Sequence, residues 1–170
     1  MVNLVVEDGT GLDNANSYVS VDDFRQFALE NGIDVESEDD EQLAIYLIRS
    51  TNFIDSLEYR FVGTRLSVTQ SLAFPRAKVC NRSHLYDMRS LKKAICFAVE
   101  VLVSGESLVP TKLNKDDFVK SEQLDVLKVQ YSEEYFKNVS TYDILNNYPM
   151  IANNMRAYLK QGNFNPTVGR

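Results

Sequence analysis

The sequence predicts a mainly α-helical fold: a helical bundle of about four helices with a small β element and an extended C-terminal tail. Apolar residues recur at helical spacing, most clearly over residues 91–102. Residues that cap helices stand at the ends of such stretches, as Ser20 and Gly105 do. Stretches typical of strands are short and few. With 170 residues, of which 44% are hydrophobic, the chain is long enough to bury a core.

The N-terminal part begins with a predicted short strand at residues 2–6, which a turn-rich loop follows. Ser20 is a good N-cap for a first helix, and Gly32 ends that helix. The acid-rich segment 34–41 lacks the glycine and the alternating ligands of a calcium loop. We therefore interpret it as a loop that leads into the acidic first turn of a second helix, which runs to about Tyr59.

The middle of the chain should be irregular, because Pro75 forbids a helix through its own position. The helix over residues 91–102 follows. A hairpin is predicted near residues 118–132, since apolar and polar side chains alternate in its second arm. The last regular element is expected to be helical over residues 141–160, with a break or restart around Pro149.

One domain is predicted over residues 1–161, followed by a tail over residues 162–170. The tail has no hydrophobic periodicity, so we expect it to become ordered only on a partner. No secretory signal is visible at the start, and the longest strongly apolar run contains Glu100 and is too short to span a bilayer. We expect no membrane contact.

Motifs of enzymes, metal sites and cofactor sites are missing from the sequence. There is no P-loop, no G-x-S-x-G elbow and no HExxH. Cys80 and Cys96 lack the spacing of a redox pair, and His84 is the only histidine. The pair of glycines in G-T-G lacks the third glycine of a phosphate-binding loop. We therefore expect a protein that is not an enzyme and holds no metal and no cofactor.

Charge is distributed unevenly along the chain. The formal net charge is -6, yet residues 59–86 contain no Asp or Glu. This segment carries +5, the rest of the chain carries -11, and extending the segment to Lys93 raises its charge to +7. The candidate site residues are its arginines and lysine: Arg60, Arg65, Arg76, Lys78 and Arg82.

Two interpretations of this basic segment remain open on chemistry alone. A single-stranded nucleic acid could bind it, because aromatic residues that could stack on bases interleave with the arginines over residues 59–93. Alternatively, a basic face and an acidic face on one chain suit head-to-tail contact between identical subunits, which closes into a ring when the rotation allows. The low isoelectric point, about 4.8, favours the contact between proteins.

Three stretches resemble a group of structural proteins of tailed phages. They are "VVEDGTGLDNANSYVSVDDF" near the start, "RFVGTRLSVTQSLAFPR" over residues 60–76, and "VKSEQLDVLKVQY" further on. The resemblance covers most of the chain in the same order, although Phe74 stands where the group commonly has tryptophan. Members of the group often bear the label "DnaT-like single-stranded DNA-binding protein". The resemblance implies the role of a head–tail connector, or adaptor.

Such adaptors form a twelve-subunit ring below the portal in the phage neck, so the resemblance implies a virion protein assembled in the host cytoplasm. Its implied partners are other copies of the chain, the portal protein, a tail or neck protein below, and double-stranded DNA that passes without specific binding. In adaptors generally a C-terminal arm reaches the portal. By position, that arm would be Gly162, Asn163, Phe164, Asn165, Pro166, Thr167, Val168, Gly169 and Arg170. The arginines of residues 60–76 are expected to fix the loop and the subunit contact through bidentate pairs with carboxylates.

Overall fold

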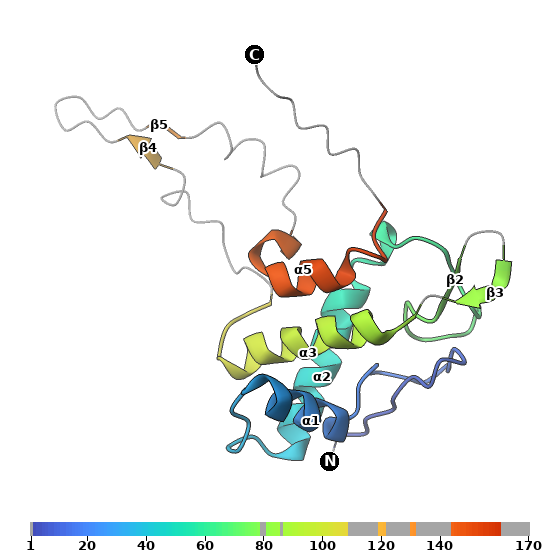
Figure 1. Cartoon of the computed structure of the whole chain (residues 1–170), viewed down its shortest axis with the longest axis horizontal. Coiled ribbons are helices and arrows are strands. Elements are labelled where there is room, and N and C mark those ends of the chain that lie inside the picture. The colour runs from blue at the N-terminus through green and yellow to red at the C-terminus, as the bar shows by residue number, and fades with distance from the viewer. Residues whose placement is uncertain are drawn as a thin grey trace. The chain divides into compact units, whose positions relative to one another are not determined.

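The structure is a computed structural model of the whole chain (Figure 1). It describes residues 2–78, 81–85, 87–108, 119–121, 130–131 and 144–160. The chain divides into two compact units, one made of residues 1–108 and 150–170 and the other of residues 109–149. The predicted boundary at residue 161 and the predicted tail lie outside the described residues.

Helices α1 and α2 both begin at a residue whose side chain caps the helix, Ser20 for α1, as predicted, and Asp39 for α2. The α1 helix spans Val21–Asn31, and its N-cap Ser20 accepts a hydrogen bond from the Asp23 amide. Gly32 closes α1 in the left-handed region, with φ of 70°. The α2 helix spans Asp40–Asp55, and Asp39 caps it by accepting a hydrogen bond from the Gln42 amide. The acid-rich segment is thus a loop that leads into a helix, as predicted.

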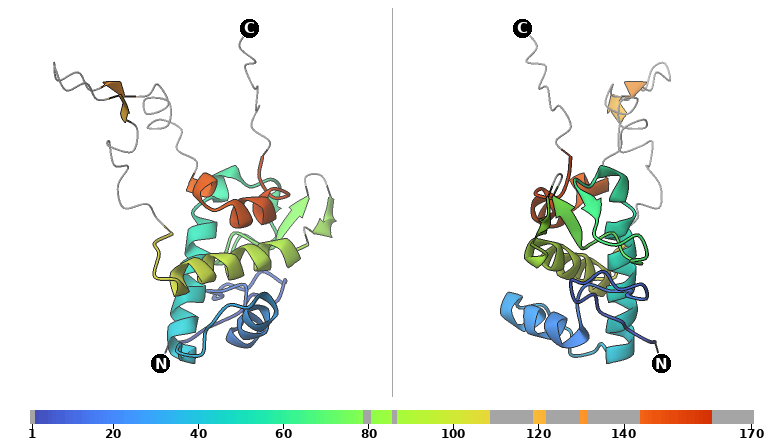
Figure 2. Two further views of the ribbon diagram at one scale, coloured as in Figure 1. Left: turned by 60° about the vertical axis from the view of Figure 1, so that its left-hand side comes forward. Right: turned by 90° about the vertical axis from the view of Figure 1, so that its right-hand side faces the viewer.

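The α3 helix, Arg89–Val103, packs against both α2 and α1. Its buried residues follow the helical spacing seen in the sequence: Leu91, Ala94, Ile95, Cys96, Ala98, Val99 and Leu102. Figures 1 and 2 show α1 near the N-terminal end of α2, whereas α5, Pro149–Met155, lies near its C-terminal end. A short 3₁₀ helix, η3, covers Ile144–Asn147 before α5, so the predicted interruption at Pro149 is confirmed. The predicted end of the helix at residue 160 is wrong, because α5 ends at Met155 and a turn follows it.

A small three-stranded antiparallel sheet occupies the middle of the chain, where the sequence predicted irregular structure. It has the order β1-β2-β3, from Thr64–Arg65, Arg76–Lys78 and Asn81–Leu85. Proline has no amide hydrogen to donate to a strand ladder. Pro75 lies just before β2, so this missing donor does not prevent the pairing of β1 with β2. The short 3₁₀ helix η1, Glu58–Arg60, leads from α2 into this region.

The predicted strand at residues 2–6 does not form. Residues 2–6 form only an isolated bridge, Val6 with Ser17, because the chain turns back on itself at the G-T-G loop instead of joining a sheet. The predicted hairpin is confirmed in the second unit, where β4, Val119–Ser121, pairs antiparallel with β5, Gln130–Tyr131. The fold class is therefore mainly α-helical with a small β element, as expected.

An aromatic cluster ties the N-terminal loop, the segment after α2 and the turn after α5 together. The Phe74 ring lies at its centre, 5.1 Å from the Phe61 centroid, 5.2 Å from Tyr158 and 6.4 Å from Tyr18. Each of these rings is at least 97% buried, so the cluster forms a core of its own beneath the arginine-rich region.

Candidate functional site: the arginine-rich loop

The arginine-rich loop, residues 60–76, is held in one conformation by a buried glutamine. The Gln70 side chain is 3% exposed. Its Oε1 accepts a hydrogen bond from the Ser67 amide at 2.9 Å, and its Nε2 donates to the carbonyl oxygens of Leu72 and Pro75 at 2.8 and 3.2 Å. One side chain thus binds three backbone groups of the loop, of which the Pro75 carbonyl also accepts a hydrogen bond from the Leu66 amide at 3.1 Å.

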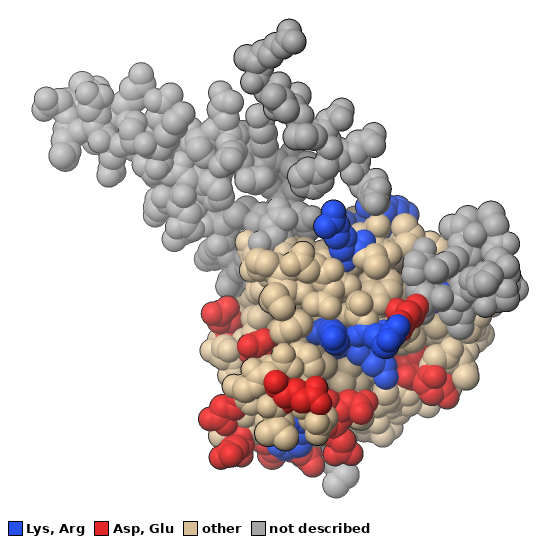
Figure 3. Space-filling view, viewed as in Figure 1, with Lys and Arg blue, Asp and Glu red and all other residues tan. Residues whose placement is uncertain are grey.

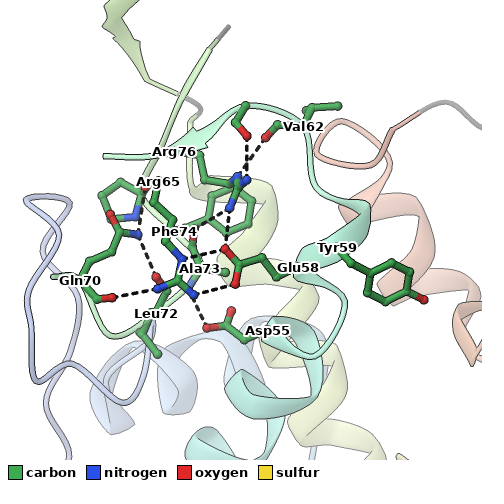
Figure 4. A network of polar contacts seen from close by, with 12 residues as sticks. Asp55, Glu58, Tyr59, Val62, Arg65, Gln70, Leu72, Ala73, Phe74 and Arg76 are labelled. Atoms are coloured by element: carbon green, nitrogen blue, oxygen red, sulfur yellow. Dashed lines mark hydrogen bonds and ion pairs between the residues drawn. The ribbon is translucent and has the colours of Figure 1, made fainter. Parts of the chain in front are cut away.

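Arg76 lies inside the fold, with only 7% of its surface exposed. Its guanidinium donates to the carbonyl oxygens of Val62, Gly63 and Ala73 at 3.0, 2.7 and 3.3 Å. It also binds the Glu58 carboxylate at 3.0 Å (Figure 4). The guanidinium carbon lies 6.0 and 5.9 Å from the Phe61 and Phe74 ring centroids. Its donors are therefore used within the chain.

Arg65 forms a bidentate pair with the same carboxylate. Its Nε and Nη2 donate to the two Glu58 oxygens at 2.7 and 2.6 Å, and Nη1 donates to the Gln70 carbonyl at 2.9 Å. The hydrogen bonds from Arg65 lower the pKa of Glu58, and Glu58 in turn raises the pKa of Arg65. Glu58 thus carries two guanidinium groups, and the bidentate pair predicted for the loop forms within the chain.

Asp55 connects the loop to the end of α2. Its Oδ2 accepts a hydrogen bond from the Ala73 amide at 2.8 Å, and its Oδ1 accepts one from the Tyr18 hydroxyl at 2.8 Å. The same hydroxyl accepts a hydrogen bond from the Phe74 amide at 2.9 Å. Burial raises the pKa of Asp55 to about 6, with the two hydrogen bonds acting in the opposite direction.

The G-T-G loop near the N-terminus binds its own carboxylate. Glu7 is buried, and its two oxygens accept hydrogen bonds from the amides of Gly9, Gly11 and Leu12 at 2.9, 2.8 and 2.9 Å. A phosphate-binding loop would leave such amides for a ligand. In this chain Glu7 takes that place, so the prediction of a tight structural loop is confirmed.

Two of the three stretches singled out in the sequence, the N-terminal loop and the arginine-rich loop, lie against each other. The Ser71 amide donates to the Leu12 carbonyl at 2.9 Å, and the Ser71 hydroxyl donates to the Ala15 carbonyl at 2.6 Å. A Cβ atom built on Gly11 would lie 3.3 Å from Gln70 Oε1. The N-terminal loop therefore supports the arginine-rich loop from one side, across more than 50 residues of sequence.

The tip of the arginine-rich loop points into solvent. Val68 is fully exposed, and its neighbour Thr69 is exposed as well. Because Gln70, Arg65 and Ser71 hold the base of this turn, the exposed valine sits on a fixed support.

The other predicted site residues are spread more widely. Arg60 is half-buried at the end of η1 and has interaction partners of its own. Lys78 ends β2 and Arg82 lies in β3, where the structure describes the backbone alone. The tail residues lie outside the described part of the chain. The structure brings Arg65 and Arg76 together on one carboxylate, and the prediction of a subunit interface at these residues stays a prediction.

Several residues that build the site were missed from the sequence, namely Glu7, Tyr18, Asp55, Glu58 and Gln70. Glu58 was the nearest carboxylate before an acid-free segment that contains five cations, and that position could have identified it. Gln70 lies in the stretch over residues 60–76 that carries the resemblance, and that position was its signal in the sequence. Among the described residues, no helix is long and apolar enough to cross a membrane, and no three His, Cys, Asp or Glu side chains gather as a metal site would require.

Comparison with known proteins gives one family. A family model described as "Putative DnaT-like ssDNA binding protein" matches residues 2–170. No curated protein and no solved structure matches the chain.

Proposed function

Because the chain belongs to the DnaT-like family, whose model covers nearly its whole length, we take that membership as the premise and propose that this member is a structural virion protein. In this proposal it is a head-to-tail adaptor, which forms a ring under the portal in the phage neck and lets DNA pass. It performs no catalytic step. The resemblance of residues 9–18 and 60–76 to connector proteins supports the role, and these are the two segments that pack together.

The observation that carries the proposal is the internal use of the loop's arginines. Arg76 is buried with every contact inside the chain, and Arg65 is committed to Glu58 and to the Gln70 carbonyl. A phosphate backbone would therefore find the Arg76 guanidinium buried and the Arg65 guanidinium already paired with a carboxylate, which leaves little positive charge to neutralise the phosphate. The tip that remains available is uncharged and carries an apolar side chain, which suits contact with a protein surface.

The net charge of -6 supports the same role. A negatively charged channel repels phosphate, so that DNA can slide through it without being held. The proposed partners are further copies of the chain in a ring of twelve, the portal protein above and a tail or neck protein below. The tail, residues 162–170, is proposed to reach the portal.

Co-sedimentation with isolated portal rings at low salt tests the proposal. We expect the full chain to sediment with the rings and a variant that ends at Gln161 to stay in the supernatant. The shortened variant should keep the helical circular dichroism of the full chain, since α1, α2 and α3 lie before the tail. If the full chain does not associate with portal rings, the adaptor role is wrong.

A second candidate function is binding of single-stranded DNA, which the description of the family favours. One surface has the required chemistry. Tyr59 is 74% exposed, and Figure 4 shows its ring pointing away from the arginine network. The Lys160 ammonium donates to the Tyr59 carbonyl at 3.0 Å. The Tyr158 hydroxyl joins this segment to the start of α3 through the Asp87 carbonyl and the Leu91 amide.

The start of α3 adds further cations to this neighbourhood, and Figure 3 shows basic side chains across the middle and upper part of this face, with acidic ones mostly below. The exposed or half-exposed cations at the start of α3 and around the end of α5 are Arg89, Lys92, Lys93, Arg156 and Lys160. An aromatic ring beside several cations is the arrangement that holds single strands by stacking and charge.

Fluorescence anisotropy with a labelled oligonucleotide distinguishes the two functions. Binding through this surface should weaken steeply with salt, and a Tyr59→Ala, Lys160→Glu variant should bind at least tenfold more weakly than the wild type. An Arg25→Glu variant is the control, because Arg25 lies at the other end of α2, paired with Asp40. A flat titration at low salt would eliminate this candidate.

A further inference from the structure

A shallow hollow lies at the C-terminal end of α1, far from the arginine-rich loop. It has a volume of about 440 Å³, within the range of pockets that take ligands or a few side chains. Ala28, Leu29, Ile33 and Val35 supply its apolar part. Leu29 is 79% exposed, which is unusual for a leucine on a helix that otherwise buries Phe24 and Ala28.

The rim of this hollow is acidic. Asp34 and Glu36 line it, and both belong to the segment 34–41, which holds six of the chain's carboxylates. Arg25 also lines the hollow, but its guanidinium binds Asp40 at 2.6 Å and donates to the Glu38 carbonyl at 3.0 Å. The exposed charges that an incoming group would meet are therefore mainly negative.

The arginine-rich loop has the complementary features. Its tip presents Val68, and the segment around the tip contains no acid from Tyr59 to Tyr86. Gln70, Arg65 and Ser71 fix the tip before any partner arrives. A segment that is already ordered loses little conformational entropy on docking, so an apolar tip on a rigid support is well suited to enter a shallow hollow.

The loop cannot reach the hollow of its own chain. Asp55 and Glu58 hold the loop at the C-terminal end of α2, whereas residues 34–36 precede its N-terminal end. The 16 residues of α2 separate the two places by about 24 Å, at 1.5 Å per residue. Figures 1 and 2 agree that α1 and the β1–β2 region lie toward different ends of α2. Only another copy can bring its loop to this hollow.

We propose that the tip of the arginine-rich loop of one copy docks into the hollow beside Leu29 of the next copy. The contact joins two different surfaces, so it repeats from copy to copy and closes into a ring when the rotation allows. Val68 contacts the apolar floor. The three arginines of the loop outnumber the Glu58 and Asp55 carboxylates bound to it, so the loop meets the acidic rim with an excess of positive charge. This inference rests on the proposed adaptor function and names the surfaces through which its ring forms.

Site-specific photo-crosslinking tests the contact. A variant with p-benzoylphenylalanine in place of Val68 is assembled with portal rings and irradiated. The linked peptides are then mapped by mass spectrometry. We expect links to residues 25–36 of another copy. Because Val68 is fully exposed, this replacement leaves the core untouched. Links that map only elsewhere, or no link between copies in assembled rings, would overturn the inference.

Substitutions give a second measurement. Val68→Asp and Leu29→Asp should each lower the yield of assembled rings at least tenfold, as counted by native mass spectrometry, with unchanged melting temperature. Met150→Asp is the matched control, since Met150 is an exposed hydrophobic residue outside both surfaces and should assemble normally. If rings form normally with Leu29→Asp, the hollow is not a subunit contact although the adaptor role stands. If the wild-type chain does not assemble with portal rings, both ideas fail.

Discussion

The Tyr18 hydroxyl donates a hydrogen bond to Asp55 Oδ1 at 2.8 Å, and this bond joins residues that are 37 positions apart in the sequence. Tyr18 belongs to the N-terminal motif, and Asp55 ends α2. The other Asp55 oxygen binds the Ala73 amide of the arginine-rich loop. One carboxylate thus fixes three chain segments that build the candidate site, so its protonation state bears on the stability of the whole region.

The stability of the fold should depend on pH through Asp55. Burial raises the pKa of its carboxyl from the ordinary value of 3.8 to about 6 in the folded chain. The folded state therefore binds this proton more tightly than the unfolded state. The stabilising contribution is fully present below about pH 4 and is lost as the pH rises through about 6, an effect on the order of 2–3 kcal/mol.

Urea unfolding of the wild type and of Asp55→Asn between pH 4 and 7.5 measures this contribution. The variant keeps one of the two acceptor oxygens and does not titrate, so the free-energy difference between the two proteins should change across this range. The wild type should have its largest advantage at the acid end. A difference that stays constant with pH would show that Asp55 does not titrate there.

Arg76 and Arg65 share Glu58, yet their substitution should have unequal costs. Arg76→Ala removes a buried guanidinium and leaves the carbonyls of Val62, Gly63 and Ala73 without their donor. We expect it to lower the free energy of unfolding by about 3 kcal/mol. The Arg65 side chain is 36% exposed, so Arg65→Ala should cost about 1 kcal/mol. Equal losses in urea unfolding would contradict the internal role assigned to Arg76.

Replacing Gly11 with alanine should destabilise the fold more than replacing Gly32 with alanine does. Both residues have positive φ, 84° and 70°, which strains any residue with a Cβ by about 1–2 kcal/mol. At Gly32 the added Cβ meets open space, whereas at Gly11 it would lie 3.3 Å from Gln70 Oε1 and 3.5 Å from Ser67 Cβ. Thermal unfolding followed by circular dichroism should therefore show a lower melting temperature for Gly11→Ala than for Gly32→Ala. The reverse order would mean that the N-terminal loop does not pack on the arginine-rich loop.

The Cys96 thiol should be unreactive in the native protein. It lies in α3 with 3% of its surface exposed, and burial raises its pKa to about 12. In a Cys80→Ser background, iodoacetamide at pH 8 should label the protein only after denaturant is added. Rapid labelling without denaturant would show that α3 does not pack stably against α1 and α2.

Hydrophobic spacing and caps predicted α1 and α3 well, because these signals are local, whereas α2 and α5 end at Asp55 and Met155, before the predicted ends at Tyr59 and residue 160. Ser20, Gly32 and Gly105 act within one turn of the helix they end, and the apolar face of α3 is visible in 15 consecutive residues. The strands were harder to predict. β1 and β2 are two and three residues long and have no alternation to detect, so only their pairing across the loop defines them.

Local patterns in the sequence were enough to predict the helical class and the cation-rich, acid-free segment, and they indicated that its arginines require carboxylate partners. The folded structure shows that Arg65 and Arg76 share Glu58, while Asp55 and Tyr18, which lie outside the segment, bind the backbone amides of the loop. It also decided that Arg76 is buried while Val68 is exposed. The physical reason is that a residue's charge is fixed by its chemistry, whereas its exposure and its partners depend on which distant segments fold against it.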